Sequence, residues 1–155
     1  MKHFEYEAIA RCKPQHVWQV FSDMDRWSEW NPVVGKSHWL TGAPWKPGST
    51  FFMEILQPKK IIFRPMIQEI LIPIRVSWTG KAPGFAGTHG HEFILMPDGT
   101  TRVRTWEDVS GFLTLFIGKR MHRQMMDMYA AWINALCREG EKLAAAQLAK
   151  ASQLP

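Results

Sequence analysis

The chain has 155 residues, close to the length of one typical domain, and 46% of them are apolar and 21% charged, which excludes a disordered or fibrous protein. The formal net charge is +5, with small basic clusters only at Lys59-Lys60 and at Lys119-Arg120 with Arg123. We interpret these clusters as solvated surface, because nucleic-acid binding usually requires a basic stripe or a recognisable module. The charge pattern therefore indicates no nucleic-acid partner.

Bulky apolar side chains dominate the composition, which includes 8 Trp, 9 Phe and 9 Met. Such a chain has either a thick core or an apolar cavity with large walls. No apolar run is long enough for a transmembrane helix, and the first residues lack the apolar stretch of a signal peptide. Cys12 and Cys137 lie far apart, which predicts free thiols in a reducing compartment. We therefore expect a single cytoplasmic domain over residues 1–155, without integral membrane association.

The first part of the chain predicts one strand followed by two short helices. Residues 2–11 alternate between apolar and polar side chains, which is typical of a half-buried strand. Pro14 suits the first turn of a helix, and apolar residues at helical spacing follow it. A second short helix is expected to end near Trp30, where Asn31-Pro32 stops it.

The rest of the chain predicts a series of strands and then one long helix. The expected strands cover residues 33–40, 50–56, 60–72, 74–79, 88–96 and 100–110. The Gly/Pro/Ala segment 80–87 predicts a flexible loop, and Pro97-Asp98-Gly99 predicts a tight hairpin with Gly99 at positive φ. From about Phe112 to about Ala149 the apolar spacing becomes helical, and residues 150–155 are expected to form a frayed tail.

This order of elements predicts an α+β fold: a curved antiparallel sheet of about seven strands, two short helices and a long C-terminal helix. One face of such a sheet must be covered, and the long helix is the available cover. Because a single helix cannot fill a strongly curved sheet along its whole length, we expect the fold to enclose a cavity.

Two blocks of the sequence resemble a known superfamily. The first runs from Lys13-Pro14-Gln15-His16-Val17-Trp18 through Phe21-Ser22-Asp23 to Trp27-Ser28-Glu29-Trp30-Asn31-Pro32, and the second runs from Gly90-His91-Glu92-Phe93 to Ser110-Gly111-Phe112. They are similar to the opening helices and the last hairpin of SRPBCC proteins, the START/Bet v 1-like group often labelled polyketide cyclase/dehydrase. The resemblance implies a helix-grip fold with a deep cavity for an apolar or amphipathic ligand. Activities in this group range from lipid carriage to aromatic ring closure, so the fold alone does not settle the function.

The last hairpin carries the most informative polar residues. Its odd loop length places odd-numbered residues of both strands on one mostly apolar face, which should point inward. His91 and Glu107 would then lie on the cavity side, close enough to interact. A carboxylate that orients an imidazole is a proton-transfer pair, and a buried, mutually satisfied polar pair is the alternative. A cation for an enolate would have to come from Arg104 or Arg75, but both fall on the opposite strand phase.

The remaining candidates are cavity walls from the short helices, the sheet and the methionine stripe of the long helix. We predict that these residues face the ligand: Trp27, Trp30, Trp78, Phe93, Leu95, Val103, Thr105, Met121, Met125, Met128 and Trp132. His89 and His91 share a strand face that Glu107 could join, but there is no third His at a convincing spacing and no Cys motif, so we expect no metal and no cofactor.

Three functions fit these observations. The first is binding or carriage of a small hydrophobic or amphipathic ligand, lipid-like or polyketide-like, in the internal cavity. The second is a polyketide cyclase/dehydrase-like enzyme that uses His91 and Glu107 for proton transfer. The third is a protein-interaction module, with Trp39, Trp45 and Trp106 on the surface and a homodimer contact near the first hairpin loop.

Overall fold

The computed structural model describes residues 1–154, apart from the side chain of Ala82. Eight strands form one antiparallel sheet. They are β1 (Lys2–Ala10), β2 (Val34–Thr41), β3 (Thr50–Ile55), β4 (Ile61–Phe63), β5 (Met66–Leu71), β6 (Arg75–Ala82), β7 (Phe85–Leu95) and β8 (Thr101–Ser110). The helices are α1 (Pro14–Ser22), the 3₁₀ turn η1 (Met24–Arg26), α2 (Trp27–Trp30), the 3₁₀ turn η2 (Phe112–Phe116) and α3 (Lys119–Ala151).

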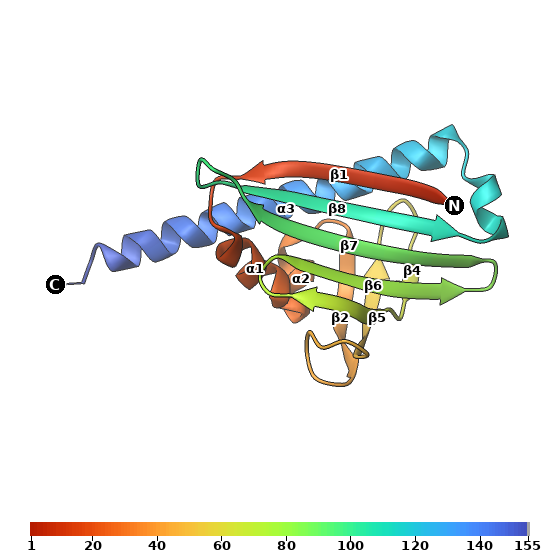
Figure 1. Ribbon diagram of the computed structural model, residues 1–155, viewed down its shortest axis with the longest axis horizontal. Helices are drawn as coiled ribbons and strands as arrows, with labels where there is room; N and C mark the ends of the chain where they lie inside the picture. Colours follow the sequence, from red (N-terminus) through yellow and green to blue (C-terminus); the bar gives the residue numbers. More distant parts are fainter. Residues whose placement is uncertain (155) are drawn as a thin grey trace.

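The sheet is an antiparallel meander in which β1 pairs with the last strand, β8, and forms one edge. Its strand order is β1-β8-β7-β6-β5-β3-β2, with β4 paired to β3 beside this path. The long helix α3 runs along one face of the sheet, and α1 and α2 lie beside the middle of α3, toward the end of the sheet that carries the hairpin between β7 and β8 (Figure 1). The predicted α+β architecture is confirmed, with eight strands where about seven were expected, because Arg64-Pro65 divides the expected strand 60–72 into β4 and β5.

The glycine-rich segment 80–87 is not the expected loop. β6 continues to Ala82 and β7 begins at Phe85, so only a tight turn separates them, with Gly84 at φ 75°. Gly87 and Gly90 lie inside β7. A Cβ atom at Gly90 would occupy the space taken by the indole ring of Trp106, so glycine is needed there for close packing on the outer face.

The predicted hairpin between β7 and β8 is confirmed. Gly99 has φ 84°, and the Met96 N–H donates to the Thr100 carbonyl over 2.8 Å. The register pairs His91 with Thr105 and Phe93 with Val103, so the odd-numbered residues share the inner face. Leu95 is the exception to their burial: its side chain is 59% exposed, because the strand ends there beyond the cover of the helices.

An aromatic core fills the space between the sheet and the two short helices. Trp27 lies at its centre, where its Nε1 donates to the Phe21 carbonyl over 2.7 Å and its ring packs edge-on against Trp132 at 5.4 Å. Trp45 is also buried, and its Nε1 donates to the Ser22 carbonyl. The expectation that Trp45 belongs to a surface aromatic patch was therefore wrong, because its loop folds back onto α1.

The last helix begins later than the sequence pattern suggested. Residues 112–116 form η2, and Gly118 is extended before α3 starts at Lys119. Gly140 causes no break; its lack of a side chain lets Cys12 and Val17 pack closely against the helix. α3 continues through Ala151, into the segment expected to fray, and Pro155 lies outside the described residues. Within residues 1–154, no helix combines the length and the apolar character needed to cross a bilayer.

Candidate functional site

A cavity of about 510 Å³ lies between the first half of α3 and the sheet, next to the aromatic core. Methionines from α3 form its roof, and two positions on its floor, Gly80 and Gly87, have no side chain. Its lining residues are Met53, Ile55, Gln57, Pro58, Lys59, Ile61, Phe63, Pro65, Trp78, Gly80, Phe85, Gly87, His89, Glu107, Leu113, Phe116, Ile117, Met121, Met125, Met128 and Trp132. The walls are mostly apolar, as in typical small-molecule sites.

Some of the residues predicted to face a ligand line this cavity. They are Trp78 from β6 and Met121, Met125, Met128 and Trp132 from α3. Trp78 and Trp132 stand where the cavity meets the aromatic core, and both are almost fully buried. The methionines in the first turns of α3 therefore face the cavity.

The other predicted wall residues do not reach the cavity. Trp27, Phe93 and Val103 are buried in the aromatic core, because α1 and α2 cover that end of the sheet. Trp30 is half-buried against the same core. Leu95 is exposed at the end of β7, so its assignment to the cavity was wrong. Thr105 faces inward but is covered by His89, to which it is hydrogen-bonded.

Two polar residues, His89 and Glu107, interrupt the apolar wall. They are direct cross-strand partners on β7 and β8. The Thr105 hydroxyl lies 2.7 Å from Nε2 of His89 and 3.2 Å from the Gly90 carbonyl. Assigning the hydroxyl proton to the carbonyl, which can only accept, makes Nε2 the donor and gives the neutral tautomer with the proton on Nε2. Nδ1 is then a hydrogen-bond acceptor, and it has no partner among the described residues.

The carboxyl group of Glu107 accepts a hydrogen bond from the Tyr129 hydroxyl of α3. Burial raises the pKa of Glu107 above its ordinary value, although the Tyr129 hydrogen bond opposes that shift. Burial likewise raises the pKa of Tyr129 and lowers the pKa of His89 to about 3. At neutral pH the site therefore presents an uncharged imidazole next to a carboxyl group that takes up a proton more readily than an ordinary glutamate.

The expected contact between His91 and Glu107 does not occur in the described structure, because the register places His91 opposite Thr105. His91 is completely buried among Phe21, Trp78 and Trp132, and neither of its ring nitrogens has a partner among residues 1–154. Burial, with a smaller contribution from His89, holds the pKa of His91 well below its usual range. His91 does not line the cavity.

His89 was considered beside Glu107 only as a metal ligand, and His91 was selected in its place for the polar pair, although the sequence contained the signal. A hairpin centred on Asp98 pairs residue 107 with residue 89, two positions before the histidine that we had selected. The apolar residues of η2 were also missed as cavity walls, since Leu113 and Phe116 had been placed in the long helix.

The two arginines considered for an enolate lie on the outer face of the sheet. Arg104 binds the carboxylates of Glu5 and Glu92, and the Nε of Arg75 lies 3.6 Å from Glu92. Neither arginine reaches the cavity. Among the described residues, no group of three histidines, cysteines or acidic residues is arranged to hold a metal ion.

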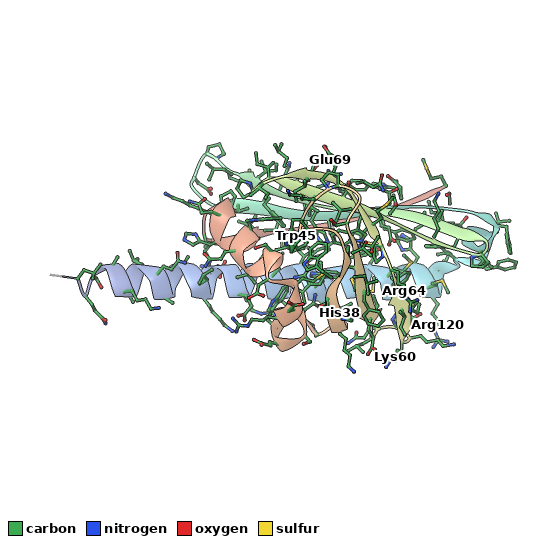
Figure 2. The ribbon with its side chains drawn as sticks, turned by 90° about the horizontal axis from the view of Figure 1, so that it is seen from below. His38, Trp45, Lys60, Arg64, Glu69 and Arg120 are labelled. Atoms are coloured by element: carbon green, nitrogen blue, oxygen red, sulfur yellow. The ribbon has the colours of Figure 1, made fainter. Side chains whose placement is uncertain are left out.

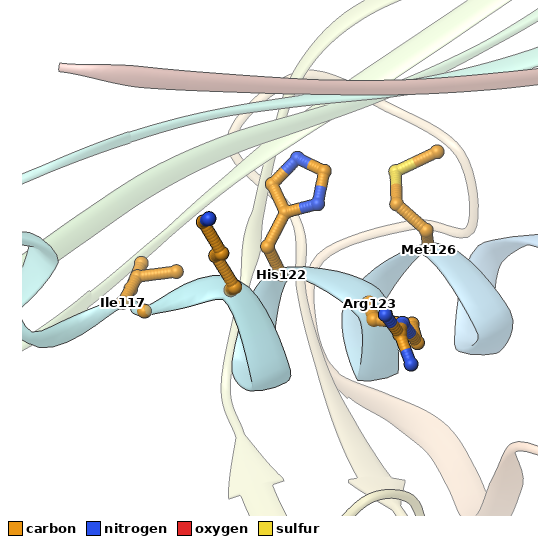
Figure 3. Close-up of a pocket in the computed structure, with 6 residues that line it drawn as sticks. Ile117, His122, Arg123 and Met126 are labelled. Atoms are coloured by element: carbon orange, nitrogen blue, oxygen red, sulfur yellow. The ribbon is translucent and has the colours of Figure 1, made fainter.

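A second hollow of about 530 Å³ lies on the surface at the start of α3. Figure 3 shows the imidazole of His122 and the side chain of Met126 pointing toward the sheet, with Arg123 seen nearly end-on beside them on the helix. This hollow is open, and most of the residues around it are exposed. We therefore take the apolar cavity as the candidate site.

Comparisons with known proteins agree with this architecture. A family model described as polyketide cyclase / dehydrase and lipid transport matches residues 1–144. A hypothetical protein from Helicobacter pylori is similar in structure, with a TM-score of 0.77 and 19% identity over 90% of this chain and 88% of the other. A comparison with curated protein sequences found no match.

Two further solved structures have the same fold. For an aromatase/cyclase from a Streptomyces species, the TM-score is 0.75 with 13% identity, over 91% of this chain and 94% of the other. For a START superfamily protein from Mycobacterium smegmatis, the TM-score is 0.68 with 11% identity, over 94% of this chain and 98% of the other. These likenesses confirm the helix-grip fold, and at such low identity they establish the fold alone.

Proposed function

The chain belongs to the polyketide cyclase / dehydrase and lipid transport family, and we propose that it binds a small hydrophobic or amphipathic ligand in the cavity beneath α3. The single observation that carries this proposal is the cavity of about 510 Å³ with apolar walls and one polar pair, His89 and Glu107. Ligand sites of known proteins typically have volumes of roughly 300–1,000 Å³ and the same combination of many apolar groups with few polar ones.

The polar pair suggests which ligands suit the site. Nδ1 of His89 accepts a hydrogen bond, so a hydroxyl group on the ligand would satisfy it. A ligand carboxylate would lie close to the carboxyl group of Glu107 and be repelled once Glu107 ionises. We therefore propose an apolar molecule with a neutral polar group, such as a hydroxylated lipid or an aromatic polyketide.

Filling the cavity tests this proposal. Gly80 lines the floor, and a Cβ atom there would meet only Phe63 at 4.0 Å, so Gly80→Leu places a side chain in the cavity without backbone strain. We expect it to weaken ligand binding by about tenfold, measured by thermal shift and native mass spectrometry with a panel of hydroxylated lipids and aromatic polyketides. Thr79→Leu, on the opposite face of β6, is the matched control. Equal binding by both variants and the wild type would contradict the proposal.

A second candidate function is proton-transfer catalysis of the cyclase/dehydrase type. It is favoured by the raised pKa of Glu107 beside the unpartnered Nδ1 of His89, because a general acid or base needs such a perturbed group within a water-poor site. We propose Glu107 and His89 as the acid–base pair, in place of Glu107 and His91. Glu107→Gln should abolish turnover of a cyclisable polyketide analogue, whereas His91→Asn should leave it intact if the protein folds. Turnover that survives Glu107→Gln would reject the enzymatic role.

We also propose the cytoplasm as the location of this protein. Cys12 and Cys137 are free, buried thiols, and burial raises their pKa values to about 11 and about 12, so both are protonated and unreactive at neutral pH. Such thiols are compatible with a reducing compartment.

A further inference from the structure

Two segments far apart in the sequence form the rim of the cavity. One lip is the hairpin between β3 and β4 (residues 56–64), which contributes Pro58, Lys59 and Ile61 to the lining. The other lip is η2 with the first turns of α3 (residues 112–123), which contributes Leu113, Phe116 and Met121. The cavity is therefore reached between these two lips.

The rim exposes large apolar side chains. On η2, the exposed fractions are 80% for Leu115, 74% for Phe116 and 64% for Phe112. On the opposite lip, Ile61 and Ile62 are also exposed. Several large exposed apolar side chains at the mouth of one cavity favour an interaction site, because single scattered residues are the norm elsewhere on a protein surface.

The same rim is strongly basic. Lys59, Lys60 and Arg64 lie on one lip, and Lys119, Arg120 and Arg123 lie on the other; residues 56–64 and 112–123 contain no aspartate or glutamate. Figure 2 shows Lys60, Arg64 and Arg120 together, toward the end of the molecule where α3 begins. Within the described chain, one ion pair involves these cations, between Lys60 and Glu54 at 3.1 Å. The two basic clusters that we had interpreted as solvated surface thus flank one opening.

We propose that this rim docks onto the surface of a bilayer that contains anionic phospholipids. Exposed phenylalanine and leucine side chains would enter the interface, while the surrounding lysines and arginines would contact the headgroups. A second copy of the chain is a poorer partner, because a symmetric contact would bring these cations against one another. Docking places the mouth of the cavity against the acyl chains, so a lipid could exchange without crossing water; this last step rests on the proposed ligand binding.

Vesicle flotation of the full chain tests the docking surface. Binding is expected to vesicles of phosphatidylcholine with phosphatidylserine, to be much weaker with phosphatidylcholine alone, and to decrease as salt is raised. Leu115→Ser should reduce partitioning by about tenfold, and Arg120→Gln by about fivefold. Neither residue lines the cavity. The matched controls are Leu148→Ser and Arg138→Gln, at exposed positions in the C-terminal half of α3, and they should bind like the wild type.

The outcomes separate docking from ligand binding. A fluorescent apolar probe in vesicle-free buffer reports on the cavity, and its affinity should be the same for the wild type and Leu115→Ser. A chain that binds the probe but not the vesicles overturns the docking surface alone, and a chain that binds vesicles but not the probe overturns the proposed function alone. Three further outcomes would overturn the proposal. The wild type could bind both vesicle types equally, or Leu148→Ser could lose as much vesicle binding as Leu115→Ser. The third outcome is a wild-type dimer that binds no vesicles and that Leu115→Ser dissociates.

Discussion

The space between α3 and the sheet is solid at one end and hollow at the other, although the same strands cross both. At the solid end, β6 and β7 present Trp78 and Phe93, and the rings of α1 and α2 pack on them. At the hollow end, two inward positions on these strands, Gly80 on β6 and Gly87 on β7, have no side chain, and the opposing helix carries flexible methionines. Of the helical elements, only α3 and the short turn η2 reach this end (Figure 1).

This difference teaches that the cavity arises from a local change of side chain rather than from the curvature of the sheet alone. Gly80 on β6 and Gly87 on β7 are cross-strand partners, so the floor lacks side chains at this point, and the cover of the short helices ends at nearly the same place. Met121, Met125 and Met128 can adapt to whatever occupies the space, because their side chains are unbranched and flexible.

The largest expected effect contrasts the two ends directly. Trp27→Ala should lower the free energy of unfolding by about 4 kcal/mol, because it leaves a large hole in a closely packed core. Met125→Ala should cost only about 1 kcal/mol, because this half-buried side chain already borders empty space. Urea denaturation at neutral pH measures both values. Similar losses for the two variants would mean that the hollow end is packed as tightly as the solid end.

The boundary between the two ends should make the protein sensitive to acid. The pKa of His89 is about 3 in the folded protein, against an ordinary value of 6.5, so only the unfolded chain takes up this proton as the pH falls from 6.5 towards 3. His89 should therefore cost about 2 kcal/mol of stability between pH 6.5 and pH 5. Glu107 has a raised pKa and acts in the opposite direction, so the His89→Gln variant is needed to isolate the histidine.

Urea denaturation of the wild type and His89→Gln at pH 7 and pH 5 measures this contribution. We expect the variant to lose about 2 kcal/mol less than the wild type over that interval. Identical losses would show that protonation of His89 is not linked to unfolding.

The smallest expected effect is at the end of β7, where the closely packed core stops. Leu95→Thr should change the stability by less than about 0.5 kcal/mol, since Leu95 lies largely in solvent. Val103→Ala, at a buried inward position of the same hairpin, should cost about 2 kcal/mol. Thermal or urea denaturation compares the two, and a large loss for Leu95→Thr would extend the core beyond the end of β7.

The hairpin illustrates how far sequence reasoning could reach. The turn residues Pro97-Asp98-Gly99 determine the register, and the register determines which side chains face inward, so these features were predictable from local chemistry. What local chemistry could not predict is how far the helices extend over the sheet. Phe93 is buried and Leu95 is exposed because the helices cover the first position and not the second. How far the helices reach depends on packing between elements that are distant in the sequence.

The glycines of β6 and β7 are a second case in which the sequence alone could not predict the packing. A run of Gly, Pro and Ala predicts a loop, because glycine weakens a strand, but Trp106 covers Gly90 and the cavity lies over Gly80 and Gly87. In both cases the missing side chain makes room for something else. The sequence shows that a side chain is missing, and only the folded chain shows what uses the space.

The division of the tryptophans between the two ends gives the protein an optical probe of its own. Trp78 and Trp132 border the cavity, whereas Trp27 and Trp45 are buried in the aromatic core and do not line it, and Trp18 packs half-buried against that core. A bound ligand would change the surroundings of the first pair and leave the others in place. The intrinsic emission of the two border residues can therefore report occupancy of the cavity without a label, once Trp106 on the outer face is replaced by phenylalanine to reduce the background.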